Sequence, residues 1–529
     1  MKYERDINFG PKVSDVTRRG FVGGILSVGA FAGCNGMLNP FGVLGDRPRL
    51  RFGVVSDVHV RLAKGGRALA KGYETDTLEK AFSWFRDNGA DAVVIAGDLA
   101  DSGVVGELKA VADVWFRVFP NDRAPDGRKV ERIFICGNHD INGMDNGRRV
   151  FPNVVERQRE TISTDPAKAW DVCFHEEYRP FFVKSVKGYD FFCSHWRPDV
   201  KTNGYREGGC SGCADAFSDL MAKCDPKRPF FYIQHPHPRD TVYGKCAWGA
   251  DDGEATKLLS AFPQCVAFSG HSHEPLTNEL ALWRGAFTSV ATGSLRSLSA
   301  NAVRNFTYTP GYENGKCNCY LPGLKWSKWA GQIAKYDAPK LMRNEMPRND
   351  IRVGQLVSVY EDRIVFAKRE FVSGLALGDD WIVELPARER TFAARAAVAR
   401  PPEFPDDSAL SVRRMTAKTR GMELRNGIDV KREDVAAFEL SFPAAALGGT
   451  VAEYEISAEN AAREHYETRI CAIGGLYPRA HAMFGKTVTA TIRADAVPSG
   501  TEEIVVTPLD SFGNKGRSLA ANIYQLKEL

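Results

Sequence analysis

Short apolar runs recur along residues 51–291, and most of them end in Asp, His or Asn. The runs are four to six residues long and show no helical period, which is typical of buried strands. They cover residues 51–56, 92–96, 133–136, 189–193, 230–234, 265–268 and 286–291. Two further runs, 355–360 and 363–369, predict a hairpin around Glu361 and Asp362.

Two stretches between the first three strands have apolar residues at helical spacing. In residues 76–88 these are Leu78, Phe82 and Phe85, and residues 107–119 repeat the pattern. Strand, helix, strand, helix, strand predicts βαβ units around a sheet. Ligands of such sheets bind outside the carboxyl ends of the strands, where these polar clusters fall.

The pattern changes near residue 385. Residues 386–410 contain four prolines, which favours an interdomain linker. Beyond it, alternating segments with turn signals between them predict an all-β sandwich over residues 411–529. The segments are 436–442, 451–457, 467–474, 486–492 and 502–507.

The N-terminus predicts export rather than a folded element. Arg18 and Arg19 precede a glycine-rich apolar run, residues 21–32, that is too short to span a bilayer. Small residues then precede Cys34. This order resembles a twin-arginine signal joined to a lipoprotein cleavage box, with Phe31 where leucine is more usual.

That resemblance implies an export signal over residues 1–34 and lipidation of Cys34. The mature chain would then be held at a membrane surface in the bacterial cell envelope, with residues 35–48 as a tether. The alternative is a disordered N-terminus with a chance arginine pair.

Composition narrows the possible partners. A chain of 529 residues, 43% hydrophobic, predicts two folded domains. Its net charge is +4 and it has no long basic run, so no nucleic-acid-binding surface is evident. An acidic or phosphorylated small substrate remains compatible with this charge.

Twelve cysteines are present, and two pairs of them are close in sequence: Cys210 with Cys213, and Cys317 with Cys319. Disulfides, a small zinc site and free thiols all remain open for these pairs. Cysteines within the strand-like runs are expected to be core residues.

The strand-end residues predict a metal centre. They are Asp57, His59, Asp98, Asn138, His139, His235, His271 and His273. Carboxylate, imidazole and amide groups bind ions such as Zn, Mn and Fe. This many ligands is too many for one tetrahedral ion and suits two ions that share a carboxylate. In extended backbone, residues two apart point the same way, so His271 and His273 are expected to face one point.

The order of the motifs resembles the calcineurin-like metallophosphoesterase family over residues 50–372. The motifs are Asp57-Val58-His59, Gly97-Asp98-Leu99-Ala100-Asp101, Gly137-Asn138-His139-Asp140, His235 and Gly270-His271-Ser272-His273. The resemblance implies a four-layer α/β/β/α sandwich over residues 49–385. The segment 499–507 resembles a late strand of a fibronectin type III-like domain, with Glu503 where that family has tyrosine.

The family resemblance also implies a role for each site residue. Asp57, His59 and His273 would bind one ion, Asn138, His235 and His271 the other, and Asp98 would bridge them. His139 would be a general acid, expected to face away from Asn138 because adjacent residues in extended backbone point opposite ways. Asp101 would orient its ring, with Asp140 as a rival. Purple acid phosphatases have a metal-binding tyrosine where this chain has Asp101, which disfavours that subfamily.

The predicted function is hydrolysis of phosphate mono- or diesters by a metal-bridging hydroxide. The metals (Mn, Fe or Zn) and the substrate stay open. The alternative is a surface-anchored binding protein with a non-catalytic scaffold, which the complete ligand set disfavours. His195, Arg197 and His237 could contact substrate or be structural, and a partner of the C-terminal sandwich is left open.

Overall fold

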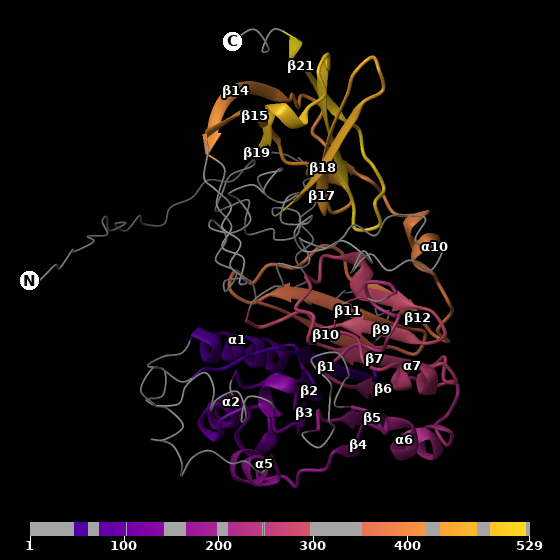
Figure 1. Cartoon of the computed structure of the whole chain (residues 1–529). Helices are drawn as coiled ribbons and strands as arrows, with labels where there is room; N and C mark the ends of the chain where they lie inside the picture. The colour runs from indigo at the N-terminus through magenta and orange to yellow at the C-terminus, as the bar shows by residue number, and fades with distance from the viewer. Residues whose placement is uncertain are drawn as a thin grey trace, which may run out of the picture. The chain divides into compact units, whose positions relative to one another are not determined.

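The structure is a computed structural model, shown in Figure 1. It describes residues 47–61, 73–101, 103–141, 166–197, 210–245, 247, 249–296, 352–418, 434–472 and 487–524. The predicted export signal, Cys34, most of the tether, Cys317 and Cys319 lie outside these ranges. No helix among the described residues is long and apolar enough to cross a bilayer.

The first sheet has six strands in the order β12-β11-β10-β1-β2-β3. Its strands are β1 Leu50–Val55, β2 Ala92–Ala96, β3 Glu131–Ile135, β10 Val353–Val359, β11 Arg363–Glu370 and β12 Trp381–Glu384. β1, β2 and β3 are parallel neighbours, whereas β10, β11 and β12 add to the sheet as antiparallel strands. The predicted βαβ order is therefore present, with α1 Tyr73–Asp87 and α2 Val105–Val118 as its helices.

The second sheet also has six strands, in the order β4-β5-β6-β7-β9-β8. They are β4 Phe181–Val186, β5 Tyr189–Ser194, β6 Phe230–Ile233, β7 Cys265–Ser269, β8 Leu282–Arg284 and β9 Thr288–Ala291. Four consecutive strands of this sheet, β5, β6, β7 and β9, run parallel. Their carboxyl ends therefore lie at one edge, as do those of β1, β2 and β3.

Apolar clusters lie on both faces of each sheet. Phe52 of β1 makes edge-to-face contacts with Phe191, Phe231 and Phe268 of the second sheet, at centroid distances of 5.1, 4.8 and 5.7 Å. Each buried phenylalanine contributes about 1.5–3 kcal/mol, so this cluster joins the sheets. The outer face of the first sheet packs against α1, α2 and α5 Pro166–Phe174. The outer face of the second packs against α6 Cys213–Met221 and α7 Glu254–Leu259.

The mixed α/β fold predicted for this part of the chain is confirmed, with one local correction. The many glycines, lysines and cysteines of residues 196–228 predict an inserted loop, but α6 lies within this segment. Cys213, Phe217 and Met221 are its buried residues and recur every four positions. They pack on Phe192 and Tyr232 of the second sheet. The helix has only nine residues and lies among glycines and lysines, so its apolar pattern repeats too few times to be recognised in the sequence.

The C-terminal part is rich in strands. After α10 Phe392–Ala396 come β13 Pro402–Glu403, β14 Ser411–Lys418, β15 Asp434–Pro443, β16 Leu447–Gly448, β17 Glu453–Glu459, β18 His465–Cys471, β19 Thr487–Arg493, β20 Glu503–Leu509 and β21 Leu519–Asn522. Two antiparallel sheets, β14-β15-β19 and β18-β17-β20-β21, share a buried core that includes Leu440, Ile456 and Ile504.

Candidate metal centre

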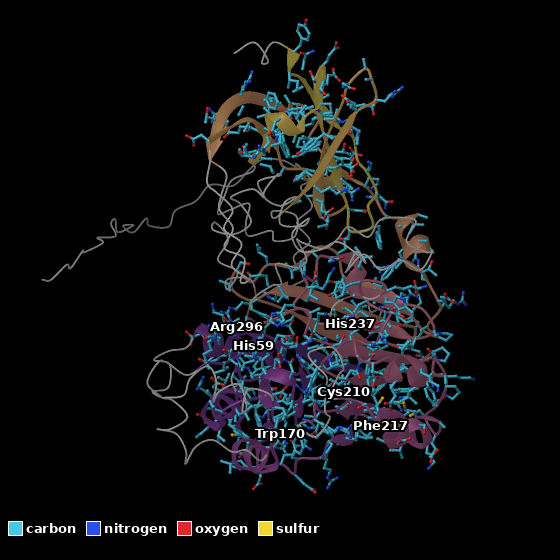
Figure 2. The ribbon with its side chains drawn as sticks, in the orientation of Figure 1. His59, Trp170, Cys210, Phe217, His237 and Arg296 are labelled. Carbon is cyan, nitrogen blue, oxygen red and sulfur yellow. The ribbon has the colours of Figure 1, made fainter. Side chains whose placement is uncertain are left out.

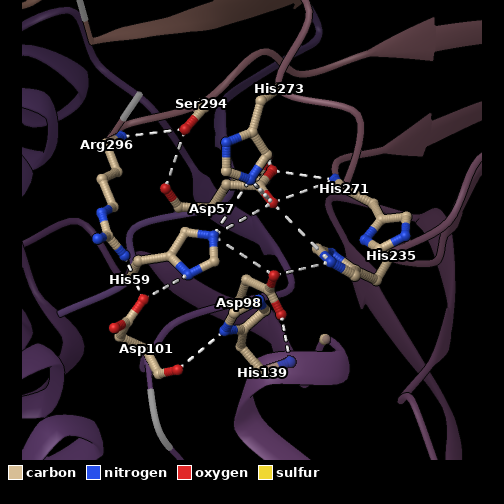
Figure 3. A network of polar contacts seen from close by, with 12 residues as sticks. Asp57, His59, Asp98, Asp101, His139, His235, His271, His273, Ser294 and Arg296 are labelled. Atoms are coloured by element: carbon tan, nitrogen blue, oxygen red, sulfur yellow. Dashed lines mark hydrogen bonds and ion pairs between the residues drawn. The ribbon is translucent and has the colours of Figure 1, made fainter. Parts of the chain in front are cut away.

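The predicted ligand residues converge at the carboxyl ends of strands from both sheets (Figure 3). Asp57 and His59 follow β1, Asp98 follows β2 and Asn138 follows β3. His235 follows β6, and His271 and His273 follow β7. Within the described residues, three groups of side chains place their ligand atoms within 4.8 Å of one another, and the third is His59, Asp101 and His139. The first is Asp57, His59, Asp98 and His273, and the second is Asp98, His235 and His271.

The first group faces a single point. The Nε2 atoms of His59 and His273 are 3.1 Å apart. Nε2 of His273 is 3.0 Å from Oδ1 of Asp57, and Nε2 of His59 is 3.5 Å from Oδ2 of Asp98. Nitrogen and carboxylate ligands that share one divalent ion lie at such separations. The donor set therefore fits a borderline divalent metal.

The second group contains a histidine whose tautomer is set by its surroundings. Nδ1 of His235 lies 2.8 Å from the backbone oxygen of Ala96, which can only accept, so Nδ1 must donate. That leaves Nε2 with a lone pair, 3.2 Å from Oδ2 of Asp98. Nε2 of His235 and Oδ1 of Asn138 are both buried without a hydrogen-bond partner among the described residues. A buried acceptor without a partner 3.2 Å from a carboxylate, as Nε2 of His235 is, fits a bound cation.

The pKa shifts of Asp98 and His235 agree with a cation at this site. Burial raises the pKa of Asp98, but His235 and His139 lower it more, so the pKa lies well below its usual value. Burial lowers the pKa of His235, but the Asp98 carboxylate outweighs it and raises the pKa to about 9. The pair therefore strongly favours a positive charge, a proton or a metal ion, between its members.

Five ligand residues have left-handed backbone conformations. The φ angles are 52° at Asp57, 47° at His59, 55° at Asp98, 67° at His271 and 55° at His273. Each such residue costs of order 1–3 kcal/mol, and such strain clusters at functional sites. The expectation of extended backbone at His271 and His273 is thus wrong. Their rings belong to different groups, joined through Asp98.

Motif glycines make room for ligands from neighbouring strands. A Cβ on Gly97 would lie 2.3 Å from Nδ1 of His235, and one on Gly137 would lie 2.2 Å from Oδ1 of Asp98. Gly97 also has φ of +92°. No side chain fits at these positions without displacing a ligand, which explains the Gly-Asp and Gly-Asn-His pairs.

His139 lies beside the first group without sharing its central point. Its Nδ1 is 2.8 Å from the backbone oxygen of Asp101, and its backbone N–H donates to Oδ1 of Asp98. Burial lowers the pKa of His139, but Asp98 and the carbonyl of Asp101 raise it above its usual value. An imidazole that keeps its proton near neutral pH suits a general acid.

Two expectations about His139 need correction. Asn138 and His139 are helical rather than extended, because a helix begins at Asn138 and includes residues 138–141. The two side chains diverge by the helical turn, not by strand alternation. In addition, Asp101 contacts His139 through its backbone carbonyl, whereas its carboxylate lies 3.3 Å from Nδ1 of His59.

Asp140, the alternative partner predicted for His139, instead accepts hydrogen bonds from backbone N–H groups. Its buried carboxylate accepts hydrogen bonds from the backbone N–H groups of Gly137, Leu99 and Ala100, at 2.7, 3.2 and 2.7 Å. Asp140 therefore ties the loop after β2 to the loop after β3, and so holds Asp98 beside Asn138.

The remaining strand-end residues lie in the protein interior. His195 is buried against Trp170 and Tyr178, and its Nδ1 accepts from the N–H of Cys136 at 2.9 Å. Burial lowers its pKa to about 3. The His237 ring contacts Tyr243, and burial lowers its pKa to about 3 as well. The guanidinium of Arg197 packs over Phe181. These contacts favour structural roles for His195 and Arg197, whereas both ring nitrogens of His237 are buried without a hydrogen-bond partner among the described residues.

Of the two cysteine pairs that are close in sequence, the structure describes Cys210 and Cys213, and these two form no disulfide. Cys210 and Cys213 are buried free thiols near the start of α6, and Cys210 is labelled in Figure 2. Sγ of Cys210 is 3.9 Å from the backbone oxygen of His195.

No motif in the sequence marks the residues that surround the predicted ligands. Ser56 donates its hydroxyl hydrogen to the carboxylate of Asp57, and Arg61 and Arg296 both contact the Asp101 carboxylate. Arg296 belongs to no motif and follows His273 by 23 positions, so no pattern marked it. Ser56 directly precedes the Asp57-Val58-His59 motif, and this position is the signal by which its contact with Asp57 could be predicted.

Comparisons with known proteins agree with the motifs. Residues 50–275 match the family model described as calcineurin-like phosphoesterase. The comparison with curated proteins gives no match. Among solved structures, the chain is similar to a dimetal phosphatase from Danio rerio, at 13% identity over 64% of this chain and 99% of that one, with a TM-score of 0.34. It is also similar to a purple acid phosphatase from yellow lupin seeds, at 12% identity over 63% and 53%, with a TM-score of 0.34.

Proposed function

Since residues 50–275 match the family model described as calcineurin-like phosphoesterase, we propose that the protein hydrolyses phosphate mono- or diesters with the aid of two bound metal ions. The observation that supports this most is the pair of ligand groups that meet at Asp98. Oδ2 of Asp98 lies 3.5 Å from Nε2 of His59 in the first group and 3.2 Å from Nε2 of His235 in the second, so this one oxygen faces both groups.

Each predicted ligand residue is assigned to one of the two ions. Asp57, His59 and His273 would hold one ion, Asn138, His235 and His271 would hold the other, and Asp98 would contact both. When bound, the two ions neutralise phosphate oxygens and lower the pKa of a water molecule to near neutrality. Their identity among Mn, Fe and Zn is open, because all three accept nitrogen and oxygen ligands.

His139 donates a proton to the departing oxygen of the ester. Its Nδ1–H is directed to the carbonyl of Asp101, so Nε2 is the atom that exchanges the proton. The raised pKa of His139 supports this role, because the ring is protonated before the leaving group departs.

The finer architecture is also a proposal. One apolar cluster lies between the two sheets, a second between the first sheet and its helices, and a third between the second sheet and its helices. This arrangement supports a four-layer α/β/β/α sandwich over residues 49–385. Residues 386–410 are the linker. The antiparallel sheets after residue 410 support a fibronectin type III-like sandwich over residues 411–529. Export and lipidation at Cys34 rest on the N-terminal sequence alone.

One experiment tests the enzymatic proposal. The purified protein is analysed for metal content and then assayed on nitrophenyl phosphate, bis-nitrophenyl phosphate and alkyl esters, before and after removal of metal by a chelator. We expect about two ions per chain and hydrolysis that stops in chelator and returns with Mn²⁺ or Zn²⁺. A protein that binds metal but hydrolyses no member of the panel would favour the binding-protein alternative. A protein without metal would contradict both the ligand assignments and the reaction.

A further inference from the structure

The carboxylate of Asp101 lies at the centre of a cluster beside the metal centre (Figure 3). Its Oδ1 contacts Nη1 of Arg296 and lies 3.3 Å from Nδ1 of His59. Its Oδ2 accepts from Nε of Arg61 at 2.9 Å. The backbone oxygen of the same residue contacts His139. One residue therefore connects a metal ligand, the general acid and two arginines.

The two arginines differ in their surroundings. The side chain of Arg61 is 52% exposed, whereas that of Arg296 is 11% exposed. Exposed ion pairs contribute little because water screens them. A buried carboxylate that loses its partner is much more costly, since the charge is left without compensation. Arg296 is therefore the residue that holds the Asp101 carboxylate in place.

Arg296 is itself anchored to the strand that positions Asp57. Its backbone N–H donates to Oγ of Ser294 at 3.0 Å, and that hydroxyl donates to the backbone oxygen of Asp57 at 3.2 Å. The N–H of Leu295 donates to the backbone oxygen of Ser56 at 3.0 Å. Nη1 of Arg352 donates to the backbone oxygen of Leu295 at 2.6 Å. The segment 294–296 is thus fixed to the end of β1.

A histidine that binds metal through Nε2 must have its proton on Nδ1. A carboxylate that accepts this proton sets the tautomer and the ring orientation, and it raises the basicity of the ligand. Asp101 stands at the Nδ1 side of His59, while Nε2 of His59 faces His273 and Asp98. The 3.3 Å contact is longer than an ordinary hydrogen bond.

We propose that Arg296 is a positioning residue that orients the metal ligand His59 by holding the Asp101 carboxylate against Nδ1 of its ring. The inference rests on the proposed function, because it assumes that His59 binds metal. When His59 holds a cation through Nε2, its Nδ1–H donates to Oδ1 of Asp101, and Arg296 keeps that oxygen in place. The neighbouring Arg61 contributes little to this effect.

The test is a metal titration of apoprotein, which needs no turnover. Mn²⁺ and Zn²⁺ are titrated calorimetrically into wild type, Arg296→Ala, Arg296→Lys and the matched control Arg61→Ala. We expect Arg296→Ala to weaken one of two binding steps by about 10–100-fold, the usual effect of losing an outer-shell partner. Arg296→Lys should recover part of the loss, and Arg61→Ala should change either step by at most about a few-fold.

A double-mutant cycle separates positioning from general damage. In a His59→Ala background, Arg296→Ala should cause no further loss of metal affinity, because the ligand through which it acts is gone. Equal additional loss in that background would overturn the proposal. So would unchanged metal affinity in Arg296→Ala together with a raised KM, since that result would assign Arg296 to substrate binding. Thermal melting of each apoprotein shows whether a variant is folded, and Arg296→Lys replaces Arg296→Ala in the cycle if the alanine variant is not.

The inference and the proposed function fail differently. If wild type binds no metal, the proposed function is wrong. If wild type binds two ions and Arg296→Ala binds them equally well, only the role of Arg296 is wrong.

Discussion

The Nε2 atoms of His59 and His273 lie 3.1 Å apart, although 214 positions separate the two residues in the chain. Two imidazole nitrogens cannot both accept from each other, so this approach requires a proton or a cation between them. Zinc binds imidazole nitrogen at about 2.0–2.1 Å, which places two such ligands about 3 Å apart. The 3.1 Å approach therefore fits either an N–H···N hydrogen bond or a cation held by both rings.

Asp98→Asn should weaken the binding of both ions, because the amide has no negative charge to share between two cations. His271→Ala is the matched control and should weaken one ion only, since His271 belongs to the second group alone. Metal analysis after gel filtration measures both. If Asp98→Asn loses a single equivalent, Asp98 does not bridge the two ions.

His139→Ala should keep both ions and lower the rate by about 10²–10⁴, the usual contribution of general acid–base catalysis. The loss should shrink for nitrophenyl esters, whose leaving group departs without a proton, and stay large for alkyl esters. Loss of a metal ion in this variant would make His139 a ligand. An equal rate loss for both ester types would remove its role as the acid.

Gly97→Ala should disrupt the second ligand group, because its Cβ would lie 2.3 Å from Nδ1 of His235. The control is Gly127→Ala, where φ is +83° and a Cβ would meet no atom within 4 Å. Both variants have the same backbone strain, so the difference in their metal affinity isolates the steric effect on His235. Equal behaviour of the two variants would show that His235 can move aside.

Acid should destabilise the protein partly through His195. Its pKa is about 3 in the folded state and about 6.5 when unfolded, so the unfolded chain binds the extra proton between these values. The free energy of unfolding therefore falls as pH drops below about 6.5, by about 1.4 kcal/mol per pH unit for this residue.

His195→Asn removes the titrating group but keeps an acceptor for the N–H of Cys136, so urea unfolding curves should show a shallower loss from about pH 6.5 to about pH 4. An unchanged slope in His195→Asn would mean that His195 is protonated in the folded protein.

Cys34→Ser should release the protein from the membrane fraction without loss of hydrolysis, because the lipid anchor lies outside the catalytic domain. Cys224→Ser is the control and should leave the protein with the membrane. Fractionation followed by N-terminal sequencing measures the effect. A wild type that is fully soluble and begins at Met1 would contradict export and lipidation.

Local patterns in the sequence were enough for the strands that precede the predicted ligand residues. The apolar run predicted at residues 92–96 coincides with β2, and the runs before His235 and His271 correspond to β6 and β7. A strand needs only a few consecutive residues to be recognised, and the motif order links ligands that lie far apart. The same analysis failed at α6, whose short apolar period lies among glycines and lysines.

Only the tertiary structure decided how the ligands are held. Three features depend on residues from different strands. Asp57 and His271 have left-handed backbone, and Asp140 joins two loops. The carboxylate of Asp101 contacts His59 instead of His139. Arg296 meets Asp101 from 195 positions away and belongs to no motif. A sequence shows which groups are available in each short segment. Which of them meet depends on chain packing, because contact energies between distant segments leave no periodic trace in the residues that make them.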